Sequence, residues 1–186
     1  MVRRLLLTLL PLAVLLPLVV TAPAQASVPS EQQWLRDVAA RMQGSQAYVD
    51  GRVAAGGTRL AVNLDIDNTS LASHYDYGAA IAVVLRFAVH AHAQGVTLLF
   101  NTGRVKGHGR LLRAERQLTA AGYPVGEVCG RSSSTEGLEH SKRRCRQHFA
   151  DEGYTLIANL GNRMTDFRGG GYERAFMLPS YHDQLA

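Results

Sequence analysis

Two aspartates separated by one residue, Asp65 and Asp67, follow an apolar stretch of the chain. Side chains two positions apart on an extended segment point the same way, so these carboxylates can converge at the end of a strand. Phosphoryl transfer needs such a pair, because one carboxylate attacks phosphorus while the other protonates the leaving oxygen and later activates water. A solvated Asp/Asn turn would contain the same residues, and the pair alone leaves both interpretations open.

Three further sets of polar residues follow later apolar runs. Thr102 offers a hydroxyl donor, and Gly103 lets the backbone approach an oxyanion closely. Lys142 is one of two lysines beside 18 arginines, which favours a site that needs a compact point charge. Asn162 and Asp166 supply hard oxygen atoms of the kind that Mg²⁺ binds. Taken alone, each set also fits a turn, an exposed helix or a helix cap.

The segments that carry these residues alternate between strand and helix patterns. We expect strands at 59–67, 96–100, 125–128, 155–160 and 174–178, and helices at 30–44, 77–94, 108–121 and 137–152. This alternation predicts an α/β fold of three layers, Rossmann-like, in which a parallel sheet carries helices on both faces. Ligands of such sheets bind beyond the carboxyl ends of the strands. The sequence therefore predicts that the polar residues meet at one edge of the sheet.

The order of these motifs resembles that of the haloacid dehalogenase (HAD) superfamily. The run VNLDIDNT at 62–69 is similar to its first motif, and the likeness continues through 101–104, Lys142 with Arg146, 153–154 and 161–166. The segment 178–181 resembles the closing segment of the superfamily's secreted acid phosphatases, the class B-like branch of plants and bacteria. The resemblance spans about residues 58 to 181 and implies a HAD-type fold, in which the spacing of the motifs leaves no room for a large cap domain.

The resemblance also implies roles, position by position. Asp65 would be the nucleophile that forms an aspartyl-phosphate, and Asp67 the general acid/base. Thr102 and Lys142 would hold the phosphate oxygens, together with the backbone at Gly103. Mg²⁺ would be held by Asp65, by Asp166 and by the main-chain carbonyl of Asp67, and it would offset the repulsion between a carboxylate and a phosphate dianion. The expected activity is hydrolysis of phosphomonoesters.

Asn162 departs from the family pattern, which commonly has an acidic residue there. Its amide oxygen can bind the metal or a metal-bound water, but the site loses one negative charge, so we expect weaker Mg²⁺ binding than in relatives with two acids. This departure leaves open a second hypothesis, a non-catalytic or weakly active exported protein that binds phosphate or a partner. Phosphotransfer to an alcohol is a close variant of the first hypothesis.

Residues 1–26 have the pattern of a secretory signal peptide. Arg3 and Arg4 precede an apolar run of 16 residues, and 24–26 reads Ala-Gln-Ala, so we expect cleavage after Ala26. A membrane anchor is the alternative, but the run contains two prolines and is shorter than the roughly 20 residues that span a bilayer. The mature protein would be secreted, free of the membrane, and one domain at 27–186, with 27–57 as an N-terminal helix and lead-in.

Cysteine content and net charge further limit the kinds of protein that this chain can be. Cys129 and Cys145 are the only cysteines, and we expect them to form a disulfide in an exported protein, with two buried thiols as the alternative. The mature chain keeps 18 basic and 15 acidic residues, a net charge of +3. That surplus attracts anions without the crowded basic face of a nucleic-acid-binding protein. Nothing in the sequence indicates an oligomeric state.

Access to the site is expected to be open. Only about nine residues separate Thr69 from the next predicted helix, too few for an inserted domain. An open site favours exposed phosphate groups on small or bulky molecules over one enclosed metabolite. His74, Tyr75, Tyr77 and His108 are candidates for the rim of the entrance, with surface packing as the alternative for each.

Overall fold

The computed structural model describes residues 28–185, so the predicted signal peptide lies outside the described residues. Five strands form one parallel sheet in the order β3-β2-β1-β4-β5. They are β1 (Leu60–Leu64), β2 (Thr97–Val105), β3 (Glu127–Arg131), β4 (Thr155–Gly161) and β5 (Arg174–Met177). Every residue of β1 is buried, as befits the central strand of a sheet covered on both faces.

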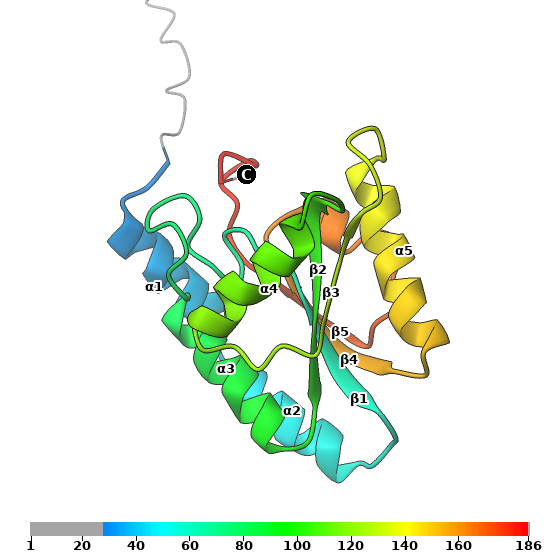
Figure 1. The fold of residues 1–186 in the computed structure, drawn as a ribbon. Coiled ribbons are helices and arrows are strands. Elements are labelled where there is room, and N and C mark those ends of the chain that lie inside the picture. Colours follow the sequence, from blue (N-terminus) through cyan, green and yellow to red (C-terminus); the bar gives the residue numbers. More distant parts are fainter. Residues whose placement is uncertain (1–27, 186) are drawn as a thin grey trace, which may run out of the picture.

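Helices cover the two faces of the sheet unequally (Figure 1). One face carries α1 (Glu31–Arg41), α2 (Ser45–Ala54), α3 (Ala82–Ala93) and α4 (Arg110–Ala120). The other carries α5 (Leu138–Asp151), and the short 3₁₀ helix η1 (Met164–Asp166) contacts α5. The three-layer α/β fold with helices on both faces is therefore confirmed.

The hydrophobic core divides between the two faces because strand side chains alternate. On β1, Val62 and Leu64 belong to the larger cluster, which also holds Trp34 and Phe87. Ala61 belongs to the smaller cluster beneath α5. A disulfide between Cys129 on β3 and Cys145 on α5 lies in that smaller cluster, which confirms the predicted pairing.

The sheet reverses its winding direction next to β1. The chain runs outward from β1 through α3 to β2 and through α4 to β3, and then returns across the opposite face through α5 to β4. The carboxyl ends of β1 and β4 therefore lie side by side at the switch point, the usual ligand position in a doubly wound sheet. Asp65 follows β1 and Asn162 follows β4, so the topology brings them together.

A helix that the sequence analysis did not predict, α2, lies between the N-terminal helix and β1 and continues through Gly51 to Ala54. Val49 is fully buried, and the Tyr48 hydroxyl donates a hydrogen bond of 2.7 Å to the Ile157 carbonyl. These contacts outweigh the cost of about 1 kcal/mol for a glycine inside a helix.

Several boundaries also differ from the expected ones. The helix predicted from Tyr77 begins at Ala82, because Ala80 pairs with Leu71 in a short bridge. The strand predicted to end at Phe100 continues to Val105.

The top of the sheet carries no cap domain within residues 28–185. The segment 65–81 between β1 and α3 consists of turns and isolated bridges. None of the helices of the described chain is long and apolar enough to cross a bilayer.

Candidate active site

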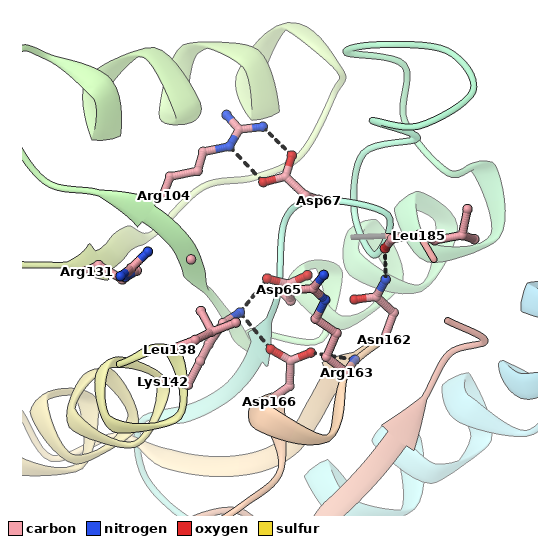
Figure 2. Close-up of a pocket in the computed structure, with 11 residues that line it drawn as sticks. Asp65, Asp67, Arg104, Arg131, Leu138, Lys142, Asn162, Arg163, Asp166 and Leu185 are labelled. Atoms are coloured by element: carbon pink, nitrogen blue, oxygen red, sulfur yellow. Dashed lines mark hydrogen bonds and ion pairs between the residues drawn. The ribbon is translucent and has the colours of Figure 1, made fainter. Parts of the chain in front are cut away.

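A cavity of about 300 Å³ opens at the carboxyl ends of β1, β2 and β4. All the predicted catalytic, phosphate-binding and metal-binding residues line it except Thr102 (Figure 2). Its full lining is Asp65, Asp67, Gly103, Arg104, Arg131, Leu138, Lys142, Asn162, Arg163, Asp166 and Leu185.

Lys142 is at the centre of the charged groups in this cavity. Its ammonium donates to Asp65 Oδ1 and lies 2.7 Å from Asp166 Oδ1 (Figure 2). It also donates to the Asn101 carbonyl at 2.5 Å. The residue is only 2% exposed, and Asn101 Nδ2 in turn donates to the Lys142 carbonyl at 2.8 Å. Three acceptors therefore fix the three N–H groups of one buried cation between two carboxylates.

Burial and neighbouring charges set the protonation of the pair. Loss of solvent raises the pKa of Asp65 to about 6, and Lys142 opposes this rise while Asp166 adds to it. Burial acts to lower the pKa of Lys142, but the two carboxylates overcome it and raise that pKa. At neutral pH Asp65 is an anion, the form that a nucleophilic carboxylate requires.

Asp166 is held by η1 and by α5. Its Oδ2 accepts a hydrogen bond of 2.9 Å from the Arg163 amide, and its carbonyl accepts from Asn159 Nδ2 at 3.0 Å and from Arg146 Nη1 at 2.6 Å. A side chain at Gly161 would collide with the Asp166 carboxylate, so glycine is required at the end of β4.

Arg146 is a buried positioning residue. It is 2% exposed, and its guanidinium donates only to backbone carbonyls, those of Asp166, Arg168 and Gly170. The sequence places Arg146 one helical turn after Lys142, so α5 supplies both the cation of the cavity and the support for Asp166.

The Asn162 side chain has one defined orientation. Its Nδ2 donates to the Leu185 carbonyl at 2.9 Å, which turns the side-chain oxygen toward the cavity (Figure 2). The same carbonyl accepts from Asn68 Nδ2 at 3.2 Å, and the Leu185 side chain is fully buried. Sequence reasoning missed Leu185, because a backbone carbonyl far along the chain carries no local signal.

Asp67 is paired with Arg104, which the sequence analysis placed in a motif without a role. The guanidinium donates from Nε to Oδ2 at 2.9 Å and from Nη2 to Oδ1 at 2.7 Å, and Ser73 Oγ donates to Oδ1 at 2.6 Å. Burial acts to raise the pKa of Asp67, but the hydrogen bonds from Arg104 and Ser73 prevail and hold that pKa below its usual value. The carboxylate points toward Arg104 and away from Asp65 (Figure 2).

Thr102 and the proposed rim residues lie outside the lining of this cavity. Thr102 is fully buried in β2, and its Oγ1 accepts a hydrogen bond of 3.2 Å from the Arg104 amide, which leaves its proton free for another acceptor. The predicted rim residues His74, Tyr75, Tyr77 and His108 do not line the cavity either. Tyr77 instead lines a neighbouring hollow, where it is 73% exposed.

The donor atoms in the cavity fit a hard divalent cation. The carboxylates of Asp65 and Asp166 line the cavity together with the side-chain oxygen of Asn162. Mg²⁺ binds oxygen ligands of this kind.

A second group of possible ligands lies elsewhere on the molecule. Glu127, His148 and Glu152 have ligand atoms within 4.8 Å of one another, but Glu127 begins β3 at the amino end of the sheet. His148 already bonds Glu127 there at 2.8 Å, so this group is separate from the cavity.

Comparisons with known proteins agree on one family. A family model described as "HAD superfamily, subfamily IIIB (Acid phosphatase)" matches residues 78–184, more than half of the chain. The matched range includes Thr102, Lys142, Asn162 and Asp166 and begins after Asp65 and Asp67. No curated protein sequence matches the chain significantly.

Solved structures share the fold at low sequence identity. The class C acid phosphatase from Bacillus anthracis aligns with a TM-score of 0.63 and 16% identity, over 81% of this chain and 79% of that one. The same enzyme with tungstate bound aligns with a TM-score of 0.61 and 14% identity, over the same shares of both chains.

Proposed function

The chain belongs to the acid phosphatases of HAD superfamily subfamily IIIB, and from that premise we propose a secreted, Mg²⁺-dependent phosphomonoesterase that acts through an aspartyl-phosphate on Asp65. One observation carries this proposal. The buried ammonium of Lys142 pairs with both Asp65 and Asp166 in a cavity that Asp67 and Asn162 also line. Phosphatases of this superfamily typically use a divalent metal ion, and the oxygen donors of the cavity suit Mg²⁺.

The first half of the proposed reaction transfers the phosphoryl group to the protein. An Asp65 carboxylate oxygen attacks phosphorus, the bond from phosphorus to the ester oxygen breaks, and the leaving oxygen takes a proton from Asp67. The protonated form of Asp67 requires that its carboxyl group leave the two hydrogen bonds from Arg104 in this step. Lys142 balances the charge on the phosphoryl oxygens, and the backbone at Gly103, which lines the cavity, donates hydrogen bonds to them. When bound, Mg²⁺ supplies positive charge that lets a carboxylate approach a phosphate dianion.

The second half releases phosphate. Asp67, now deprotonated, takes a proton from a water molecule whose oxygen attacks phosphorus, and the bond between phosphorus and Asp65 breaks. Inorganic phosphate leaves, and both carboxylates return to their starting forms. The two hydrogen bonds from the Arg104 guanidinium to the Asp67 carboxylate stabilise the deprotonated form that this step requires.

Export of the protein is part of the proposal. It is supported by the signal-peptide pattern of residues 1–26 and by the Cys129–Cys145 disulfide, which persists in oxidising compartments. Expression of the full chain in a secreting host, followed by N-terminal sequencing of the released protein, is expected to find Ser27 as the first residue. Retention of an uncleaved chain in the membrane would refute export.

The enzymatic proposal is tested by release of phosphate from 4-nitrophenyl phosphate by the chain 27–186. We expect turnover with Mg²⁺, loss of turnover with a chelator, and a loss of about 10⁴-fold or more in Asp65→Asn. Asp151→Asn is the matched control, since Asp151 is an exposed aspartate at the end of α5. An Asp65→Asn variant as active as the control would refute the assignment of the nucleophile.

A further inference from the structure

A second hollow adjoins the catalytic cavity on the side of Asp67. It has a volume of about 550 Å³, and Asp67 and Arg104 line both spaces. The rest of its lining comes from Tyr77 before α3, from Val105 on β2 and from Arg110, Arg113 and Gln117 on α4. Because the proposed acid/base forms part of both walls, the hollow begins where a leaving group would emerge from the cavity.

The hollow carries an excess of positive charge. Asp67 is its only acidic lining residue, and Arg104 neutralises it through two hydrogen bonds. Arg110 and Arg113 are exposed, and within the described chain neither forms a salt bridge with a carboxylate; Arg113 only donates to the His108 carbonyl at 3.5 Å. Two guanidinium charges therefore remain without a counter-charge, in a wall directly beside the reaction centre.

A hydrogen-bonded chain holds the inner wall of the hollow in place. Arg104 Nη1 donates to Gln117 Oε1 at 2.6 Å, and Gln117 Nε2 donates to the Tyr77 hydroxyl at 3.2 Å. This chain connects the exposed Tyr77 to Arg104, and Tyr77 lines the hollow together with Arg110 and Arg113 of α4. An aromatic face and two cations suit a leaving group that is flat or apolar near the ester and anionic farther out.

We propose that this hollow is the leaving-group site and that it selects phosphomonoesters whose leaving group carries a second anionic group, a carboxylate or a second phosphate. Arg110 and Arg113 bind that anion, and Tyr77 contacts the body of the leaving group. The inference rests on the proposed function, since it needs Asp67 at the leaving oxygen. It adds a specificity that the catalytic residues alone do not provide, because in the proposed reaction Asp65 and Lys142 act on the transferred phosphoryl group and Asp166 holds the metal.

The test compares three aryl phosphates that differ only at the position opposite the ester: phenyl phosphate, 4-carboxyphenyl phosphate and 1,4-phenylene bisphosphate. For the wild-type chain with Mg²⁺ we expect kcat/KM about tenfold higher for the two anionic substrates than for phenyl phosphate, with most of the difference in KM. The preference is expected to shrink as salt is added, because exposed charges are screened. Comparison of kcat/KM for the two anionic substrates shows whether the hollow prefers a carboxylate or a second phosphate.

The deciding variant is Arg110→Gln combined with Arg113→Gln, in which the preference over phenyl phosphate is expected to fall about tenfold. Arg116→Gln is the matched control, because Arg116 is an exposed arginine of the same helix outside the lining. The inference would be overturned if the double variant kept the preference for anionic substrates, or if the wild type showed no such preference. In either case, turnover of phenyl phosphate would still support the proposed phosphatase activity. A wild type that hydrolyses none of the three would instead overturn the proposed function.

Discussion

At the scale of single residues, two aspartates only two positions apart lie in different environments. Asp65 is buried against the Lys142 ammonium, whereas Asp67 is held by the Arg104 guanidinium and the Ser73 hydroxyl. In the proposed reaction, Asp65 attacks phosphorus and Asp67 acts on the side of the leaving group. Different surroundings give two carboxylates two tasks.

The Asp67→Asn variant tests the acid role of that residue. We expect kcat/KM for an alkyl phosphate, glycerol 3-phosphate, to fall about 10²–10⁴-fold, because an alkoxide leaves poorly without a proton. For 4-nitrophenyl phosphate the loss is expected to be about tenfold smaller, since that leaving group is a stable anion. Equal losses for the two substrates would contradict the acid role, and Asp65→Asn supplies the comparison in which equal losses are expected.

The Asn162→Asp variant tests the placement of this residue beside the metal. An added negative charge facing the cavity is expected to tighten Mg²⁺ binding about tenfold in isothermal titration calorimetry. Without metal the variant is expected to unfold at a lower temperature than wild type, because a carboxylate replaces the amide that donates to the Leu185 carbonyl. Mg²⁺ would then raise its melting temperature more than that of wild type. Unchanged Mg²⁺ affinity would place Asn162 away from the ion.

At the scale of elements, α5 does more for the site than its polar sequence suggests. It carries Lys142 and Arg146 on its buried side, and the disulfide ties it to β3 through Cys145. The loop before it is fixed as well, because Glu136 accepts hydrogen bonds from Arg144 Nε at 2.8 Å and from the Ser132 amide at 2.5 Å.

Removing the disulfide tests how firmly α5 is fixed. The bridge joins cysteines 16 positions apart, and a loop of this size predicts a loss of about 3 kcal/mol in the free energy of unfolding for Cys129→Ser combined with Cys145→Ser. Urea titration measures this loss. Reductant is expected to destabilise the wild type by a similar amount and to leave the double variant unchanged. A wild type indifferent to reductant under denaturing conditions would contradict the stabilising role.

The Glu136–Arg144 pair predicts a pH dependence of stability. Hydrogen bonds from Arg144 are the main cause that lowers the pKa of Glu136 from 4.5 to about 2. A carboxyl whose folded pKa is depressed stabilises the protein above its unfolded pKa, and this contribution is lost as the pH falls toward the folded value. Glu136→Gln is therefore expected to lower the free energy of unfolding by about 1 kcal/mol at pH 7.

That difference between Glu136→Gln and wild type is expected to shrink below pH 4.5, as urea titrations at several pH values would show. Glu115→Gln, on the exposed face of α4, is the matched control. A difference that stays constant down to pH 3 would contradict the ion pair as its cause.

At the scale of the whole molecule, the site is built where the winding of the sheet reverses, from segments that lie about 100 residues apart in the chain. Strand–helix alternation was enough to predict the three-layer fold, because apolar runs and glycine stops are local signals. The same rule placed Asp65, Lys142, Asn162 and Asp166 at one edge of the sheet, and the structure lines one cavity with them.

Contacts that join distant parts of the chain could not be predicted from the sequence. The Asp67–Arg104 pair, the Leu185 carbonyl under Asn162 and the support of Asp166 by Arg146 depend on how loops fold back. The helix α2 was missed because Gly51 lowers its intrinsic propensity, while its stability comes from packing against the sheet. Local patterns therefore located the site but not its supports.

The measurement that tests the central claim most directly is a search for the covalent intermediate. The chain 27–186, mixed with 4-nitrophenyl phosphate and Mg²⁺ and quenched with acid during turnover, is expected to carry phosphate on the peptide that contains Asp65. The label is expected to be released by hydroxylamine, as acyl phosphates are, and to be absent from Asp65→Asn. Steady turnover with phosphate on a different residue, or with no phosphorylated protein at any quench time, would contradict the account.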